Sequence, residues 1–148
     1  MPQPAVVTVA SALWIAAGLL GVAAALVMLL DLDGLEAAVR GVVDRDFLAE
    51  AQSARDRAVS LTSTVLVAGG FVGLAEVAAG MWLRAGRGAM RLLLVVLLAA
   101  AAAEVVFAVS VVDVVARTGL LLGVACGLVA AVLGYLPAAN RWFATRRR

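Results

Sequence analysis

Histidine and lysine are absent from this chain of 148 residues, and cysteine occurs once, as Cys126. A single cysteine cannot form a disulfide within the chain, so membrane enzymes that relay disulfides through cysteine pairs are excluded. The one thiol lies inside an apolar stretch, and no acidic cluster at membrane depth has the spacing of metal ligands. We therefore expect no enzymatic activity, no cofactor and no metal site.

Charge is also scarce, because 15% of the residues are charged and 65% are hydrophobic, with a mean hydropathy of +1.08. Soluble domains are only about 45–50% apolar, so a water-soluble fold could not bury this much apolar surface. The apolar residues extend over most of the chain, which predicts that residues 1–148 form a single membrane domain. All twelve basic residues are arginine. GC-rich codons favour that choice, which indicates a high-GC bacterium. We expect the protein in the cytoplasmic (inner) membrane of such a bacterium.

Four segments are long enough to cross a hydrocarbon core about 30 Å thick, which takes roughly 20 helical residues. They cover residues 5–30, 58–83, 92–112 and 118–136. Glu76 is the only charged residue of the second segment, and Glu104 is the only one of the third. Pro137 should end the fourth segment, because proline cannot donate a helical hydrogen bond. The expected fold is all-α, a bundle of four transmembrane helices followed by a tail of residues 137–148.

Arginines gather in two of the short segments outside these spans. Arg84, Arg87 and Arg91 lie between the second and third spans, and Arg141 and residues 146–148 lie in the tail. Because arginine resists translocation, both segments belong in the cytoplasm, which also places the N-terminus there. The loop 31–57 and the turn 113–117 are then external. Basic residues that flank apolar spans are typical of a protein whose partner is the lipid bilayer, and no nucleic-acid binding is expected.

The external loop contains apolar residues at helical spacing: Leu35, Val39, Val42, Val43, Phe47, Ala51 and Ala54. This spacing predicts an extramembrane amphipathic helix. We expect Asp33 to be its N-cap with Glu36 as capping-box partner, and Glu36 to pair with Arg40. The seven acids and four arginines of the loop fit two interpretations. The helix either binds a cation or a partner, or lies solvated over the bundle.

Glycine recurs at four-residue intervals in two of the spans. Gly69 and Gly73 have this spacing in the second span, where Gly80 falls in the same sector, and Gly119, Gly123 and Gly127 have it in the fourth. Small residues on one face let helix backbones approach closely where lipid gives no hydrophobic drive. We expect these glycines to be helix-packing residues, either within the chain or between copies of it.

Glu76 and Glu104 are the two ionisable residues expected at membrane depth. A turn of about 100° per residue puts Glu76 in the glycine sector of its helix, and Glu104 in a sector with Ala100, Ala101 and Ala108. Both carboxyl groups should therefore face protein rather than lipid. Helical rise offsets the two by one to two turns, which argues against one proton held directly between them.

A carboxyl group in the membrane is a candidate site for a proton or a cation. A protonated glutamic acid can equally donate a hydrogen bond that only fixes helix packing. Both interpretations of Glu76 and Glu104 stay open at this point.

The segment Gly134-Tyr135-Leu136-Pro137-Ala138-Ala139-Asn140-Arg141-Trp142-Phe143 resembles the close of uncharacterised small four-helix integral membrane proteins of actinobacteria. The resemblance covers these residues and the topology, and it implies a fold but no activity. Small multidrug resistance transporters also have four helices and a membrane glutamate. Theirs lies in the first helix, however, and residues 5–30 here carry no charge.

Two functions fit these features. The first is a non-enzymatic membrane scaffold or accessory subunit, joined through its glycine-rich faces into a homo-oligomer or to another membrane protein. The alternative is a small proton-coupled transporter or channel that uses Glu76 and Glu104. An enclosed polar cavity that reaches both carboxyl groups would favour the alternative, and a dry, fully packed bundle would favour the scaffold.

Overall fold

The structure is a computed structural model and describes residues 3–46, 52–108 and 114–145, without the side chains of 42–46, 52–55, 108 and 114. In these residues the chain is helical and has no strand. Its helices are α1 (Ala5–Leu30), α2 (Leu32–Asp46), α3 (Gln52–Arg84), α4 (Met90–Ala108), α5 (Val114–Gly134) and α6 (Pro137–Thr145). Four of them, α1, α3, α4 and α5, are long and apolar enough to cross a membrane. The prediction of an all-α fold with four such helices is confirmed.

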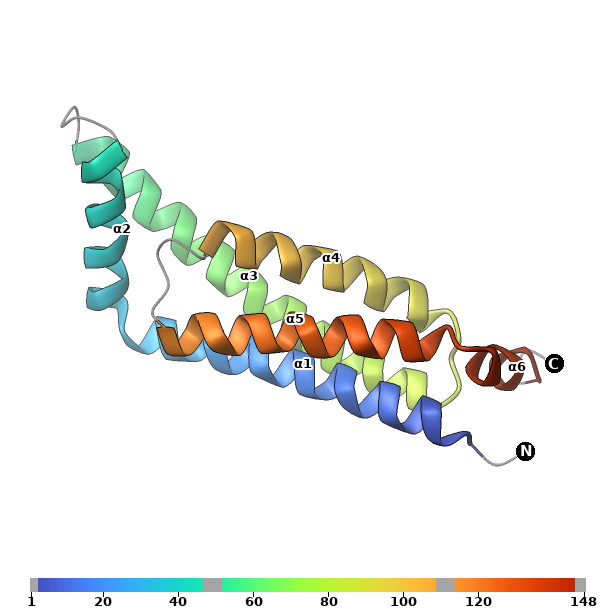
Figure 1. The fold of residues 1–148 in the computed structure, drawn as a ribbon. Coiled ribbons are helices and arrows are strands. Elements are labelled where there is room, and N and C mark those ends of the chain that lie inside the picture. Colours follow the sequence, from blue (N-terminus) through green and yellow to red (C-terminus); the bar gives the residue numbers. More distant parts are fainter. Residues whose placement is uncertain (1–2, 47–51, 109–113, 146–148) are drawn as a thin grey trace.

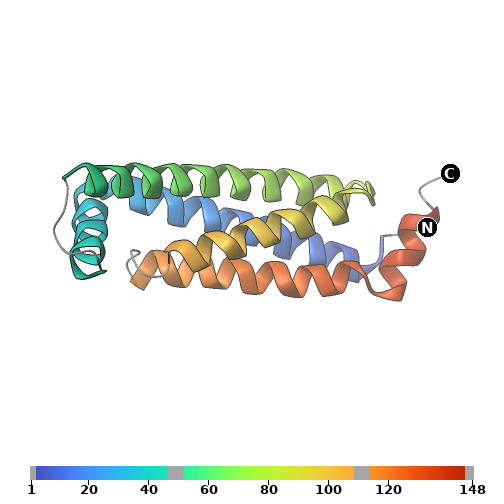
Figure 2. The same ribbon diagram turned by 90° about the horizontal axis from the view of Figure 1, so that it is seen from above.

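The four long helices run alongside one another in one bundle (Figure 1). α1 packs along both α3 and α5, and α4 contacts the same two helices (Figure 2). The start of α1, the link between α3 and α4, and α6 lie at one end of the bundle, which we call the link end. α2 lies across the opposite end.

Three helices begin earlier than the apolar spans that predicted them. α3 begins at Gln52, because residues 52–57 contain no proline or glycine to interrupt a helix that continues beyond its apolar part. α4 begins at Met90, and α5 begins at Val114 rather than at about Thr118. Hydropathy marks where a helix enters hydrocarbon, not where its hydrogen bonding starts. Residues 109–112 of the expected third span, and position 113, lie outside the described residues.

The N-terminus of α2 is capped by Asp31, so the prediction of Asp33 as the cap is wrong. The side chain of Asp31 accepts a hydrogen bond from the backbone N–H of Gly34 at 3.1 Å. Its carbonyl oxygen accepts one from the N–H of Leu35 at 3.0 Å. Because Leu32 is already helical, the capping side chain must come from the preceding residue, and Asp33 lies in the first turn.

The side chains of α2 divide between two faces. Leu35 and Val39 are buried against the ends of α1, α3 and α5. Glu36 and Arg40 are exposed and form the predicted ion pair. The expected apolar positions from Val42 to Ala54 have side chains outside the described part of the chain.

α6 is not anticipated by the sequence analysis, which treats residues 137–148 as a tail. Pro137 follows the end of α5 and also begins a new helix, a position that suits proline because no N–H is required in the first turn. α6 turns Ala139, Trp142 and Phe143 into the link end of the bundle. The ring of Trp142 is buried, with its centroid 4.9 Å from that of Phe143 in an edge-to-face arrangement.

The apolar core is divided into two clusters. The link-end cluster contains Val7, Trp14, Ala79, Leu83, Leu94, Leu98, Ala130, Ala139, Trp142 and Phe143. The α2-end cluster contains Ala24, Met28, Leu35, Val39, Leu66, Ala116 and Leu120. Each cluster draws residues from several helices, so the middle of the bundle lies between two apolar layers.

Candidate carboxyl site

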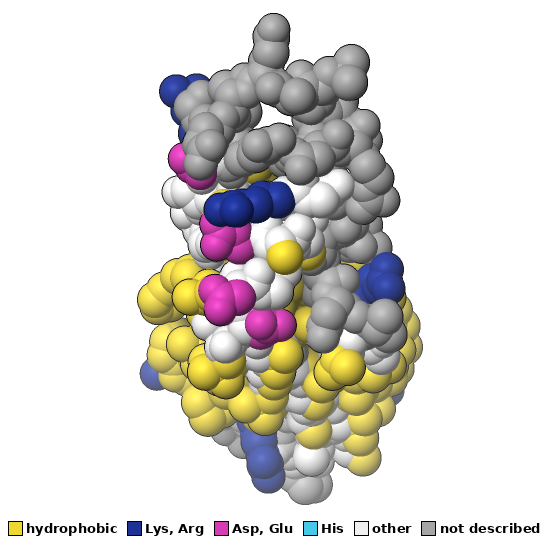
Figure 3. Space-filling model, turned by 90° about the vertical axis from the view of Figure 1, so that its left-hand side faces the viewer, with side chains coloured by type: hydrophobic (Ala, Val, Ile, Leu, Met, Phe, Trp, Pro, Cys, Tyr) yellow, Lys and Arg dark blue, Asp and Glu magenta, His cyan; other side chains and the backbone are white. Residues whose placement is uncertain are grey.

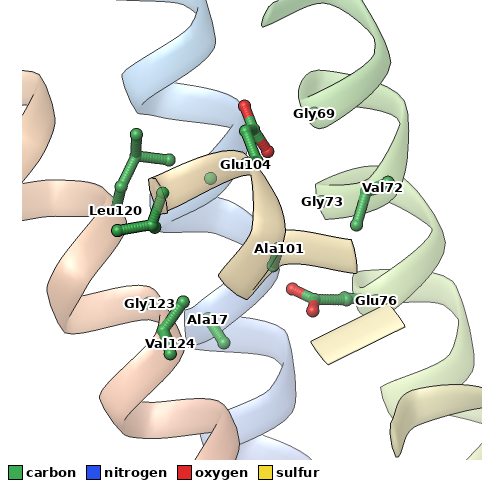
Figure 4. Close-up of a pocket in the computed structure, with 12 residues that line it drawn as sticks. Ala17, Gly69, Val72, Gly73, Glu76, Ala101, Glu104, Leu120, Gly123 and Val124 are labelled. Carbon is green, nitrogen blue, oxygen red and sulfur yellow. The ribbon is translucent and has the colours of Figure 1, made fainter. Parts of the chain in front are cut away.

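A small cavity lies where the four long helices meet (Figure 4). Its volume is about 20 Å³, and a water molecule needs roughly 10–15 Å³ measured in this way. The lining residues are Ala17 and Gly21 of α1, Gly69, Val72, Gly73 and Glu76 of α3, Ala101, Glu104 and Val105 of α4, and Leu120, Gly123 and Val124 of α5. Both carboxyl groups singled out from the sequence therefore reach one cavity.

The cavity lies between the two apolar clusters. In α1 its lining residues come after Trp14 of the link-end cluster and before Ala24 of the α2-end cluster. In α3 they come after Leu66 and before Ala79. Apolar side chains therefore separate the carboxyl groups from both ends of the bundle.

Glu76 is held on the face of α3 that packs against α1, and 4% of its surface is exposed. The glycines on either side bring the two helices together. A Cβ on Gly73 would lie 2.7 Å from the carbonyl oxygen of Gly18, and one on Gly80 would lie 3.1 Å from the side chain of Ile15. Figure 4 shows the carboxyl group pointing from α3 toward Ala101 of α4. Packing of the glycine face thus directs Glu76 into the bundle.

Glu104 approaches the cavity from α4, and 9% of its surface is exposed. Its carboxyl group lies against Gly69, in the space that a Cβ on residue 69 would occupy (Figure 4). Gly69 precedes Glu76 by two helical turns, so the two carboxyl groups approach α3 at different levels. This arrangement favours two neighbouring binding positions, one at each carboxyl group, over a single proton held directly between the two.

Neither carboxyl group has a hydrogen-bond or ion-pair partner among the residues that the structure describes. Glu76 and Glu104 are the only ionisable residues that line the cavity. Within the described residues, no group of three His, Cys, Asp or Glu side chains could hold a metal ion. What the site offers is carboxyl oxygen, which takes up a proton or coordinates a hard cation.

The glycines of the fourth span contact α1 and α4 of the same chain. A Cβ on Gly123 would lie 3.3 Å from the carbonyl oxygen of Ala17. One on Gly127 would lie 2.7 Å from the side chain of Leu98 and 3.2 Å from the ring of Trp14. Gly119 is packed less tightly, because a Cβ on it would lie 3.8 Å from the Cβ of Ala24.

The alanines expected to share a face with Glu104 have separate surroundings. Ala101 lines the cavity, whereas Ala100 is exposed. The side chain of Ala108 lies outside the described residues.

The contribution of α1 to the site was not predicted from the sequence. Gly18 makes the closest approach to α3, because a Cβ on it would collide with the carbonyl oxygen of Gly73. Ala17 and Gly21 line the cavity itself. The signal in the sequence was the group of small residues Ala17, Gly18 and Gly21, but residues 5–30 contain many other alanines, so these three do not stand out.

Comparison with models of known protein families, with curated proteins and with solved structures finds no match to this chain. The resemblance of residues 134–143 to actinobacterial membrane proteins stays a prediction.

Proposed function

We propose that this protein is a small membrane transporter that binds a proton or a small cation at Glu76 and Glu104. The observation that carries the proposal is the cavity at the junction of the four long helices, which both buried carboxyl groups line. An ionisable side chain at membrane depth is expensive to bury, so two at one cavity favour a role in moving ions or protons.

A purely structural role for the two carboxyl groups has less support. A carboxyl that serves packing should hydrogen bond across a helix interface, because an unsatisfied polar group is costly in a low-dielectric interior. Neither Glu76 nor Glu104 does so among the described residues. The glycine faces that motivated the scaffold contact helices of the same chain. An oligomer would therefore need a different surface.

The two apolar clusters are consistent with a site closed toward both ends of the bundle. A transporter must open such a site to one side at a time, which requires one element to move against the rest. α4 is the best candidate, because it carries Glu104 and only 11% of its apolar span is buried, against 33% for α1. We propose that displacement of α4 exposes the carboxyl groups.

The distribution of charge supports an orientation in the bacterial inner membrane. Arg84, Arg87 and Arg91 lie at the link end, together with Arg141 of α6. By the positive-inside rule this end faces the cytoplasm, with both termini. Figure 3 views the opposite end, where acidic side chains gather over α2. We propose that α2 is the extramembrane helix, with Leu35 and Val39 against the bundle and its acids in external water.

Reconstitution of the purified chain into lipid vesicles tests this function. The wild type should admit protons, Na⁺ or Li⁺ down an imposed gradient faster than protein-free vesicles do. Glu104→Gln should lose this flux, because the amide can neither release a proton nor carry the charge that attracts a cation. Glu36→Gln, at an exposed glutamate of α2, is the matched control and should transport like the wild type. Wild-type vesicles that admit none of the three ions faster than protein-free vesicles would contradict the proposal.

A further inference from the structure

Gly69 faces Glu104 across the contact between α3 and α4. The carboxyl group of Glu104 occupies the position that a Cβ at residue 69 would need, so this carboxyl fits here only beside a residue without a side chain. The neighbouring Gly70 differs. A Cβ on it would lie 3.4 Å from that of Ala25, which is ordinary contact. A methyl group therefore has room at position 70, whereas at position 69 it would overlap the Glu104 carboxyl group.

The size of the cavity limits what the carboxyl groups can receive. A volume of about 20 Å³ holds one water molecule or one ion without its hydration shell. The charged groups that face it are Glu76 from α3 and Glu104 from α4, and the lining residues of α1 and α5 are apolar. An organic cation such as tetraethylammonium would have to force the helices apart.

We propose that Gly69 is a positioning residue, because it leaves the space in which the Glu104 carboxyl lies beside α3, and that the resulting site accepts a proton or one bare metal cation and excludes organic cations. This inference rests on the proposed function and specifies its substrate class. Gly69 itself offers no ligand side chain. It acts through the place that it leaves for Glu104.

The positioning role is tested by infrared difference spectroscopy of the full chain in lipid vesicles, recorded between acidic and alkaline buffer. The carbonyl band of the Glu104 carboxyl is identified by its loss in Glu104→Gln. Gly69→Ala should shift this band, because the new methyl group displaces the carboxyl. Gly70→Ala, the same change one residue along the same helix, should leave it in place. An unshifted band in Gly69→Ala would overturn the positioning role.

Transport gives the second measurement. Gly69→Ala should lower proton or Na⁺ flux at least about tenfold, because displacement of a site group by about 1 Å is enough to spoil a preorganised site. Gly70→Ala should stay within about twofold of the wild type. In Gly69→Ala/Glu104→Asp the carboxyl is one methylene shorter and clears the new methyl group, so part of the flux should return. Equal flux in Gly69→Ala and Gly70→Ala would contradict the proposal.

The size limit is tested with the ions themselves. Addition of tetraethylammonium at constant pH should leave the Glu104 band unchanged and should not compete with proton or Na⁺ uptake. A band that Na⁺ perturbs at constant pH identifies a metal cation as the occupant, and a band that responds to pH alone identifies a proton. Uptake of tetraethylammonium, or a band shift caused by it, would overturn the limit. If the wild type carries no ion at all, the proposed function fails, while the infrared band still decides the role of Gly69.

Discussion

At the scale of single residues, glycine decides how closely α1 and α3 approach. Gly18 and Gly73 lie backbone to backbone, so that neither position has room for even a methyl group. Gly21, three residues along α1, has space, because a Cβ there would lie 3.8 Å from the nearest atom of Gly73. The packing of α1 against α3 therefore requires glycine at position 18 but not at position 21.

This difference predicts opposite effects of the same substitution. Gly18→Ala should lower the stability by about 1 to 3 kcal/mol, because the backbones of α1 and α3 must separate. Gly21→Ala should be neutral or raise it by up to about 1 kcal/mol, because alanine favours the helix. Thermal unfolding in detergent measures both. Equal melting temperatures for the two variants would show that the Gly18 contact is not close.

At the scale of elements, Arg91 joins three helices at the link end. Its Nε donates to the carbonyl oxygen of Gly88, and its Nη1 donates to that of Gly134, the last residue of α5, at 3.3 Å. Nη1 also donates to the side chain of Asn140 in α6. The guanidinium lies over the rings of Tyr135 and Phe143, at 5.2 and 4.6 Å from their centroids. One side chain thus connects the start of α4 to the end of α5 and to α6.

Arg91→Lys keeps the positive charge but should weaken the attachment of α6 to the bundle. The lysine ammonium lacks the planar guanidinium, which donates hydrogen bonds from several nitrogens and stacks on two rings. The expected loss of stability is about 1 to 2 kcal/mol. Hydrogen exchange should accelerate in residues 137–145. Arg84→Lys, at an exposed arginine at the end of α3, is the control and should change neither. Identical exchange in the two variants would show that Arg91 does not hold α6.

The elements differ in how far sequence alone could predict them. The four spans follow from hydropathy, since about 20 apolar residues have few alternatives to a membrane helix. α6 could not be predicted from Pro137, because proline ends one helix and begins another equally well. The cap of α2 was placed at Asp33 rather than Asp31, because several acids compete at the start of a helix and only the backbone decides among them.

At the scale of the whole molecule, the distribution of arginine should determine which end of the bundle faces the cytoplasm. Reporter fusions at Arg148 and within residues 40–50 test the orientation. The C-terminal fusion should give a cytoplasmic signal and the loop fusion an external one, because translocation of the arginines at the link end is unfavourable. An external signal from the fusion at Arg148 would contradict the proposed orientation.

The site is also a property of the whole molecule, and only part of it could be predicted. Helical geometry correctly indicated that Glu76 and Glu104 are buried in the bundle, although Ala100, expected on the same face as Glu104, is exposed. The contact between Glu104 and Gly69 depends on how far α4 slides along α3, and no periodicity within a single helix encodes that register. The part of α1 in the cavity was missed for the same reason, since its small residues gain a role only opposite Gly73.

The most direct test of the account is the comparison of Glu76→Gln with Glu76→Ala in reconstituted vesicles. Glutamine keeps the shape and hydrogen-bonding capacity of the protonated acid but cannot exchange a proton. Glu76→Gln should therefore keep the wild-type melting temperature and lose proton or cation flux. Glu76→Ala should lose the flux as well, and about 1 kcal/mol of stability with it, because the buried methylene group of the glutamate side chain is removed. Flux at the wild-type rate in Glu76→Gln would contradict the account and would leave Glu76 with a structural role.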